Sequence, residues 1–228
     1  MPRAAAIFDL DGTLLGHGTA ERLFVRRALR ARVLSRWRVA GGALRSVAAW
    51  AGGQVATPGE RKAWFAGADC RRLESAAVEC VDADIAPRLR PALLQLLQAH
   101  REAERCTVLL TGTPDVLAEA LARFLQVEVT LAARLERRGN RCTGRVLAPF
   151  PFAGGKRRAL IELAARLDLD LAASYAYANR GSDAEHLRLV GRPCAVAPDR
   201  GLRRLARRLG WDLLEDDERF AARTRPGR

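Results

Sequence analysis

The chain has 228 residues, about half of them hydrophobic, which is enough for one domain of ordinary size or a core with a smaller insert. No stretch of the sequence is long and apolar enough to predict a transmembrane helix. The five cysteines are scattered, with no C-x-x-C pair and no zinc-like spacing to the three histidines, so we expect reduced thiols in a cytoplasmic protein.

The formal net charge is +13, which indicates an anionic partner or surface. Nearly all of the positive charge is arginine, because lysine occurs only at positions 62 and 156. Arginine in place of lysine, together with abundant alanine, glycine and leucine, is typical of a GC-rich genome. We therefore do not expect nucleic acid to be the main partner, and Lys156 is a rare residue in this chain.

Residues 4 to 9 predict a short buried strand that ends in aspartate and glycine. The apolar run is too short for a signal peptide and leads directly into "DLDGT", which supports the cytoplasmic assignment.

Residues 20 to 50 have a helical pattern. Their apolar residues recur at steps of three and four, and a break is expected near Gly41 and Gly42; this predicted stripe consists of Val25, Leu29, Val33, Trp37, Ala40, Leu44 and Val47. Residues 60 to 104 continue the helical pattern, with boundaries expected at Pro87 and Pro91. The segment 17–100 is therefore predicted to be an all-helical unit.

From residue 107 onward, predicted strands alternate with helices. We expect strands at 107–110, 127–131, 174–179 and 193–198, a turn at 111–115, a hairpin within 134–147, and helices at 116–125, 156–167 and 199–209. The first strand needs a sheet and must belong with these elements. The predicted fold class is thus α/β, a Rossmann-like parallel sheet core formed by 1–16 and 101–228, with an inserted helical cap domain at 17–100.

Polar residues gather at the predicted strand ends, where parallel sheets place their active sites. The first strand supplies Asp9 and Asp11, which point to the same side of an extended chain. Two adjacent carboxylates repel each other unless a cation or a proton lies between them, and oxygen-only ligation favours Mg²⁺. Later strand ends supply Thr111 and the loop of Asn179 and Asp183.

These residue types fit phosphoryl transfer. A carboxylate attacks phosphorus to form an aspartyl-phosphate, while its neighbour protonates the leaving oxygen and then activates water. A hydroxyl group and the Lys156 ammonium group would hold the phosphoryl oxygens and offset their charge.

Four segments together resemble the haloacid dehalogenase-like (HAD) hydrolases. "DLDGT" at 9–13 resembles the first motif of that family, "LTGTP" at 110–114 the second, "GGKRRAL" at 154–160 the third and "YANRGSDAEHLRLVG" at 177–191 the fourth. The helical insert between the first two motifs is similar to the cap of the phosphoserine-phosphatase-like subgroup.

The resemblance implies a role for each motif residue. Asp9 would be the nucleophile and Asp11 the general acid/base, with Asp9 and the Asp11 main-chain carbonyl as Mg²⁺ ligands. Thr111, with Gly112, and Lys156 would bind the phosphoryl group. Many relatives carry aspartate where this chain has Asn179, so the amide oxygen of Asn179 and the carboxylate of Asp183 are the expected metal ligands of the fourth motif.

The expected activity is Mg²⁺-dependent hydrolysis of a small phosphomonoester beneath the cap. Two alternatives stay open. The substrate could be a phosphorylated lipid headgroup at a membrane, since Arg22, Arg26 and Arg30 form a basic stripe that either faces solvent, meets anionic lipid or grips an anionic substrate. The second alternative is a low-turnover phosphate- or nucleic-acid-binding protein, suggested by Asn179 and the positive charge. The three histidines, 17, 100 and 186, are expected to be surface or packing residues.

Overall fold

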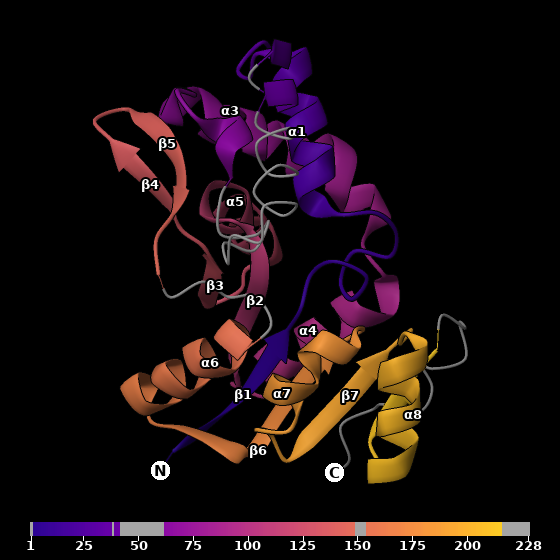
Figure 1. Cartoon of the computed structure of the whole chain (residues 1–228). Helices are drawn as coiled ribbons and strands as arrows, with labels where there is room; N and C mark the ends of the chain where they lie inside the picture. The colour runs from indigo at the N-terminus through magenta and orange to yellow at the C-terminus, as the bar shows by residue number, and fades with distance from the viewer. Residues whose placement is uncertain (1, 38, 42–61, 149–153, 216–228) are drawn as a thin grey trace, which may run out of the picture.

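The computed structural model describes residues 2–37, 39–41, 62–148 and 154–215. Its centre is a six-stranded parallel sheet with the strand order β3-β2-β1-β6-β7-β8, which confirms the predicted α/β class (Figure 1). The strands are β1 (Arg3–Phe8), β2 (Cys106–Pro114), β3 (Val129–Ala133), β6 (Leu169–Ala178), β7 (Arg192–Val196) and β8 (Asp212–Leu214).

Strand β1 lies in the interior of the sheet, between β2 and β6, and this position explains its unbroken apolar sequence. Ala5 and Ile7 pack with α6 (Gly154–Leu167), α7 (Ala184–Leu187) and α8 (Arg200–Leu209) on one face of the sheet. Ala6 and Phe8 point to the other face, which is covered by α4 (Pro91–Glu102) and α5 (Asp115–Leu125). A strand buried on both faces needs apolar side chains at every position.

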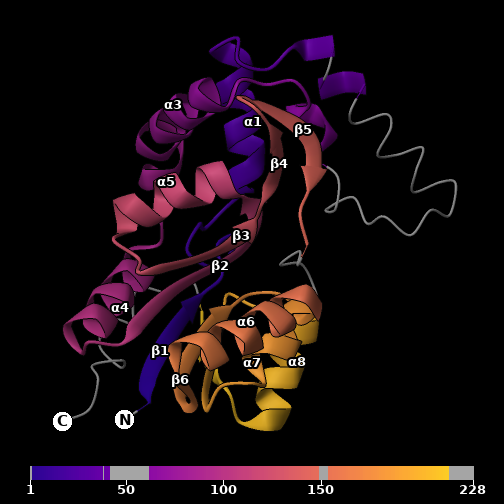
Figure 2. The ribbon, with the colours of Figure 1, turned by 90° about the vertical axis from the view of Figure 1, so that its left-hand side faces the viewer.

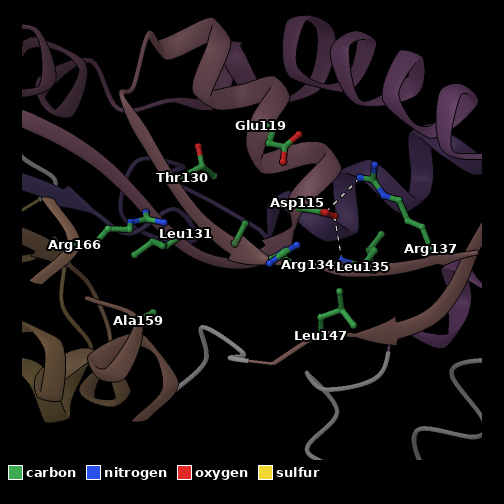
Figure 3. Close-up of a pocket in the computed structure, with 11 residues that line it drawn as sticks. Asp115, Glu119, Thr130, Leu131, Arg134, Leu135, Arg137, Leu147, Ala159 and Arg166 are labelled. Carbon is green, nitrogen blue, oxygen red and sulfur yellow. Dashed lines mark hydrogen bonds and ion pairs between the residues drawn. The ribbon is translucent and has the colours of Figure 1, made fainter. Parts of the chain in front are cut away.

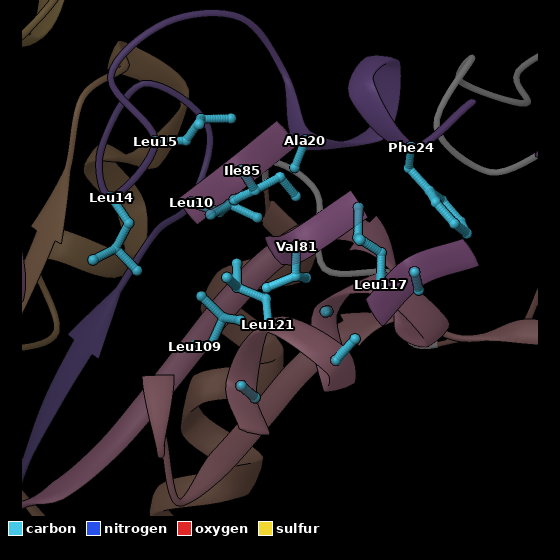
Figure 4. Packing of buried hydrophobic residues seen from close by; sticks show 14 of the residues in the cluster. Leu10, Leu14, Leu15, Ala20, Phe24, Val81, Ile85, Leu109, Leu117 and Leu121 are labelled. Carbon is cyan, nitrogen blue, oxygen red and sulfur yellow. The ribbon is translucent and has the colours of Figure 1, made fainter. Parts of the chain in front are cut away.

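The inserted segment is helical where the structure describes it. It contains α1 (Ala20–Arg30), η1 (Ala63–Phe65), α3 (Cys70–Cys80), η2 (Val81–Ile85) and η3 (Ala86–Arg88). Elements α3 and η2 pack on α5, as the side view shows for α3 (Figure 2), whereas α1 packs on α3 and also contacts strand β2 of the sheet. Leu10, at the end of β1, lies in the same apolar cluster as Val81, Leu117 and Leu121 (Figure 4), so the insert and the core share one buried layer.

The predicted hairpin is present as β4 (Leu135–Arg138) and β5 (Arg141–Val146), joined at Gly139. It lies against the insert (Figure 1), where the amide of Cys142 donates a hydrogen bond to the carbonyl of Ala68 at 3.0 Å. The amide of Gly67 donates in turn to the carbonyl of Cys142 at 2.7 Å. The hairpin therefore extends the helical insert, although it comes from the α/β part of the sequence.

The predicted helical stripe at 25–47 is wrong at Trp37 and Ala40, which are exposed. Helix α1 ends at Arg30, and its buried residues are Ala20, Phe24 and Ala28, while Val25 and Leu29 are half-buried. Burial of Phe24 against Phe65, with ring centroids 5.7 Å apart, fixes the rotation of the helix. Farther along the predicted stripe, Val33 is half-buried, Trp37 is 87% exposed and Ala40 is exposed, while Leu44 and Val47 lie outside the described residues.

Two further differences concern the strands. The predicted turn at 111–115 is wrong, because β2 continues to Pro114 through a register shift against β3, and α5 begins at Asp115. Strand β8 was not predicted, since its three residues are too few for a sequence pattern. Within the described residues, no helix has the length and apolarity needed to span a bilayer.

Helix α4 falls inside the segment expected to be the cap, but it packs on the sheet. His100 contacts Tyr177 of β6, with Nε2 and the tyrosine hydroxyl 2.8 Å apart, and its ring lies 6.0 Å from that of Phe8. We propose that the cap ends just before Pro91 and that α4 belongs to the core.

Candidate active site

Three buried side chains from distant parts of the sequence form an ionic cluster at the carboxyl end of β1. The ammonium group of Lys156, on the first turn of α6, lies 2.5 Å from Oδ1 of Asp9 and 2.8 Å from Oδ1 of Asp183. Each of the three residues is at most 6% exposed. One cation thus holds two carboxylates together in a site with little access to water.

The two carboxylates keep Lys156 charged. Burial alone would lower the pKa of Lys156, but the negative charges of Asp9 and Asp183 outweigh it and raise the pKa above its usual value. Lys156 is therefore a permanent positive charge beside Asp9, able to attract and neutralise an anionic group.

The second carboxylate oxygen of Asp9 is held by Thr13. The hydroxyl of Thr13, which is fully buried, donates a hydrogen bond to Oδ2 of Asp9 at 2.9 Å. The amide of Asp9 donates to the carbonyl of Tyr177 in β6 at 3.0 Å. The orientation of Asp9 is thus fixed from two sides, and Thr13 is a site residue to which the sequence pattern assigned no role.

Asp11 faces the start of the insert. Its Oδ1 accepts a hydrogen bond at 2.7 Å from the amide of Ala20, the first residue of α1. Burial raises the pKa of Asp11 to about 6, and the negative charges of Asp9 and Glu21 add to the rise, while the Ala20 hydrogen bond and Lys156 oppose it. A carboxyl group with this pKa can both donate and accept a proton near neutral pH.

Asn179 follows β6 directly and lies against the loop of the first motif. A Cβ atom at Gly12 would come within 2.0 Å of Asn179 Nδ2, and Gly12 has a φ of +85°, which only glycine adopts easily. Among the described residues, Oδ1 of Asn179 is buried and accepts no hydrogen bond. This oxygen is therefore an available ligand beside Asp9 and Asp11.

Thr111 lies on β2, the neighbour of β1, and is 2% exposed. Its Oγ1 accepts a hydrogen bond from the amide of Thr113 at 3.1 Å, with Gly112 between them. The described contacts do not join Thr111 to Lys156 or Asp9. The structure thus brings Asp9, Lys156 and Asp183 into contact and places Thr111 on the adjacent strand β2, three residues before its last residue, Pro114.

The chain crosses between core and insert twice, and the two crossings are tied together. Leu15 forms an isolated antiparallel bridge with Leu89, and the guanidinium group of Arg90 donates to the carbonyls of Gly12 at 2.5 Å and Thr13 at 2.8 Å. Arg90 thus holds the backbone of the first motif in place. No pattern in the sequence predicted this role.

His186 is also buried in this region. Its Nδ1 lies 3.9 Å from Oδ1 of Asp183, and burial, aided by the charge of Lys156, lowers the pKa of His186 to about 3. His186 is therefore a neutral ring packed behind Asp183. The packing role expected for the histidines fits His100 and His186, while His17 is exposed.

A separate cleft of about 740 Å³ opens at the free edge of β3, between the base of the hairpin and α6 (Figure 3). Asp115 crosses it, bound to Arg137 at 3.3 Å and to the amide of Leu135 at 3.3 Å. Its described lining includes none of the predicted site residues. We interpret Asp115 as the residue that fastens the hairpin to α5.

The residues of the ionic cluster fit a divalent cation. The oxygens that could ligate it are the carboxylates of Asp9 and Asp183, which also bind Lys156, the amide oxygen of Asn179, which accepts no hydrogen bond within the described residues, and the main-chain carbonyl of Asp11. No group of three or more His, Cys, Asp or Glu side chains with metal-binding geometry occurs among the described residues, so a cation here would depend on this mixed oxygen set. Hard oxygen donors of this kind suit Mg²⁺.

The family model of the haloacid dehalogenase-like hydrolases matches residues 6–188. A putative hydrolase of Mycobacterium leprae is 33% identical over 219 residues, which cover 93% of this chain and 72% of that protein. A phosphoserine phosphatase of Mycobacterium tuberculosis is 32% identical over 219 residues, covering 93% of this chain and 70% of that protein.

Solved structures show the same fold. A protein of unknown function from Bordetella pertussis superimposes with a TM-score of 0.80 at 24% identity, covering 95% of this chain and 100% of that one. A phospho-aspartyl intermediate analogue of phosphoserine phosphatase superimposes with a TM-score of 0.62 at 13% identity, covering 95% of each chain. The chain therefore belongs to the haloacid dehalogenase-like hydrolases, which confirms the prediction of a HAD-type phosphatase at the level of family and enzyme class.

Proposed function

We propose that this hydrolase removes the phosphoryl group of a small phosphomonoester, with Asp9 as the nucleophile. The observation that carries the proposal is the buried cluster of Asp9, Lys156 and Asp183, in which a fixed cation lies within 2.5 Å of the attacking carboxylate. A phosphoryl group beside Asp9 would meet the Lys156 charge in a site where charge interactions are stronger than in water.

The reaction would have two steps. In the first, an oxygen of Asp9 attacks phosphorus, the bond from phosphorus to the ester oxygen breaks, and protonated Asp11 gives its proton to the leaving alcohol. In the second, Asp11, now a carboxylate, takes a proton from water as that water attacks the phosphorus of the aspartyl-phosphate. The bond to Asp9 breaks, phosphate leaves, and Asp11 is again protonated.

Asp11 suits these two roles because its pKa of about 6 lies near neutral pH. Asp9, Asp183, Asn179 and the Asp11 carbonyl would hold Mg²⁺. When bound, the ion would stabilise the negative charge on the phosphoryl oxygens.

A charged pair in the insert favours a substrate that carries both a positive and a negative group besides its phosphate. Glu21, adjacent to Ala20 at the start of α1, is ion-paired with Lys62, which is only 4% exposed, and accepts a hydrogen bond from Trp64 Nε1 at 3.0 Å. An amino acid phosphate has an ammonium and a carboxylate that match this pair. Phosphoserine is therefore the first substrate to test, which agrees with the name of the M. tuberculosis relative, a phosphoserine phosphatase.

The test of the chemistry is Asp9→Asn, assayed with Mg²⁺ and an aryl phosphate. We expect kcat/KM to fall by at least about a thousandfold, since an amide does not form the acyl phosphate. Asp82→Asn, which changes an exposed carboxylate of η2, is the matched control and should keep full activity. Acid-quenched wild type should contain a phosphorylated peptide that includes residue 9; comparable turnover in Asp9→Asn would exclude the covalent route.

The test of the substrate class is Lys62→Gln. It should raise KM for phosphoserine about tenfold or more, in keeping with the loss of one charged contact, and leave the aryl phosphate constants near those of wild type. An equal change for both substrates would place Lys62 in support of the fold and not in recognition.

A further inference from the structure

The outer side of the insert is strongly basic. Arg22, Arg26 and Arg30 are all exposed along α1, and Arg32 and Arg36 are exposed just beyond its end. From residue 22 to residue 59 the sequence contains eight arginines and no aspartate or glutamate. No acidic residue interrupts this segment, and Arg27 within it is ion-paired with Asp84 of η2 at 2.8 Å, so the segment keeps a large excess of positive charge.

A cleft of about 880 Å³ lies where α1 ends. Its described lining has four arginines and no acidic residue; it consists of Leu29, Arg30, Arg32, Val33, Leu34, Ser35, Arg36, Ala66, Gly67, Ala68 and Arg141. Arg141 comes from the hairpin and donates a hydrogen bond to the carbonyl of Gly67 at 2.8 Å, which ties the hairpin to the 66–68 segment of the lining. We call these eleven residues the arginine cleft.

Apolar groups accompany the charges. Leu29 and Val33 are half-buried in the wall of the arginine cleft, and Trp37, one residue beyond Arg36, is 87% exposed. An indole ring exposed beside arginines is typical of segments that lie at a membrane–water interface, where the ring meets the acyl boundary and the cations meet headgroup phosphates.

We propose that the arginine cleft and Trp37 dock the protein on membranes that contain anionic phospholipids, with lipid headgroup phosphates in the cleft. The surface is separate from the catalytic residues. Helix α1 begins at Ala20, whose amide is bound to Asp11, and rises about 15 Å over the ten residues to Arg30. Docking would thus locate the enzyme at a membrane without taking part in the reaction.

The experiment is sedimentation of the full chain with vesicles at near-physiological salt. Phosphatidylcholine vesicles are compared with vesicles in which about a quarter of the lipid is phosphatidylglycerol. The cleft variant is Arg30→Gln/Arg32→Gln/Arg36→Gln. Because each arginine near an anionic surface changes partitioning about fivefold, we expect this variant to bind the anionic vesicles about a hundredfold more weakly.

The matched control removes the same charge elsewhere. Arg204→Gln/Arg207→Gln/Arg208→Gln changes three exposed arginines of α8 and should bind nearly as wild type does. Trp37→Ala should also weaken binding, with an unchanged far-ultraviolet circular dichroism spectrum. Both results would support the docking surface.

Three outcomes would overturn it. Equal losses in the cleft and α8 variants would mean attraction by net charge alone. Equal binding to neutral and anionic vesicles would exclude headgroup recognition. Cleft-dependent binding of a single-stranded oligonucleotide, with no sedimentation on anionic vesicles, would assign the cleft to nucleic acid instead of lipid.

Discussion

His100 should make the stability of the fold depend on pH. It is 4% exposed between α4 and the sheet, and burial, together with the charge of Arg105, lowers the pKa of His100 to about 4. Arg105 lies 3.1 Å from Nδ1 and has only N–H donors, so Nδ1 accepts and the neutral ring donates from Nε2 to the hydroxyl of Tyr177. A proton on Nδ1 would break the contact with Arg105.

The size of the effect follows from the two pKa values of His100. In the unfolded chain the pKa is about 6.5, so as the pH falls from about 6.5 to about 4 the unfolded state binds a proton that the folded state rejects. The unfolded state binds more protons in this range, and the free energy of unfolding therefore decreases as the pH decreases. The total is about 3 kcal/mol, of which about 2 kcal/mol falls between about pH 7.5 and about pH 5.

The assay is urea unfolding of wild type and His100→Gln at these two pH values and one ionic strength. At pH about 7.5 the variant should have a lower free energy of unfolding than wild type because its packing is altered. When the pH is lowered to about 5, its free energy of unfolding should fall by about 2 kcal/mol less than that of wild type. The control is His17→Gln, because His17 is exposed and should not change the pH dependence. His186 is present in all three proteins and cancels in the comparison. If His100→Gln and wild type lose the same free energy between the two pH values, the reasoning about His100 is refuted.

Three further predictions concern the ionic cluster and its loop. Lys156→Met should lower the free energy of unfolding by about 3–5 kcal/mol in urea unfolding, because it leaves two buried carboxylates without a counter-charge, and Lys156→Arg should lower it less. Gly12→Ala should reduce kcat/KM for an aryl phosphate about tenfold or more, because the added Cβ would collide with Asn179. Gly18→Ala is the control and should not reduce it, because Gly18 has a similar φ of +84° but an added Cβ there would meet no atom within 4 Å. Asn179→Asp should lower, and Asn179→Ala should raise, the Mg²⁺ concentration that gives half-maximal activity; identical Mg²⁺ titrations would remove Asn179 from the metal site.

The position of Asp9 could be predicted from the sequence because a parallel strand constrains it strongly. A buried apolar run ending in two aspartates indicates an interior strand with polar groups at its carboxyl end, and β1 has this position in the sheet. Lys156 lies at the start of α6 and not at a strand end, so its contact with Asp9, 147 residues away in the sequence, does not follow from this rule.

The residues that support the motif were not predictable in the same way. Thr13 and Arg90 act through hydrogen bonds to Asp9 and to the carbonyls of Gly12 and Thr13, and such bonds leave no periodic signal. The rotation of α1 was also missed, because periodicity alone did not decide between the Val25 side and the Phe24 side. Contact between Phe24 and Phe65, some forty residues apart, decided it.

The balance of charge in the cluster gives a physical reason for asparagine at position 179. Asp9 and Asp183 carry two negative charges against the single positive charge of Lys156, and Asp11, with a pKa of about 6, adds most of another at neutral pH. The proposed divalent cation would bring this total close to zero, whereas a further carboxylate at 179 would leave an excess of negative charge in a buried site. In the proposed Mg²⁺ site Asn179 would supply an oxygen without adding charge, and its side chain packs closely against Gly12. The asparagine therefore fits the proposed Mg²⁺ site, in which Asp183 would provide the carboxylate of the fourth motif.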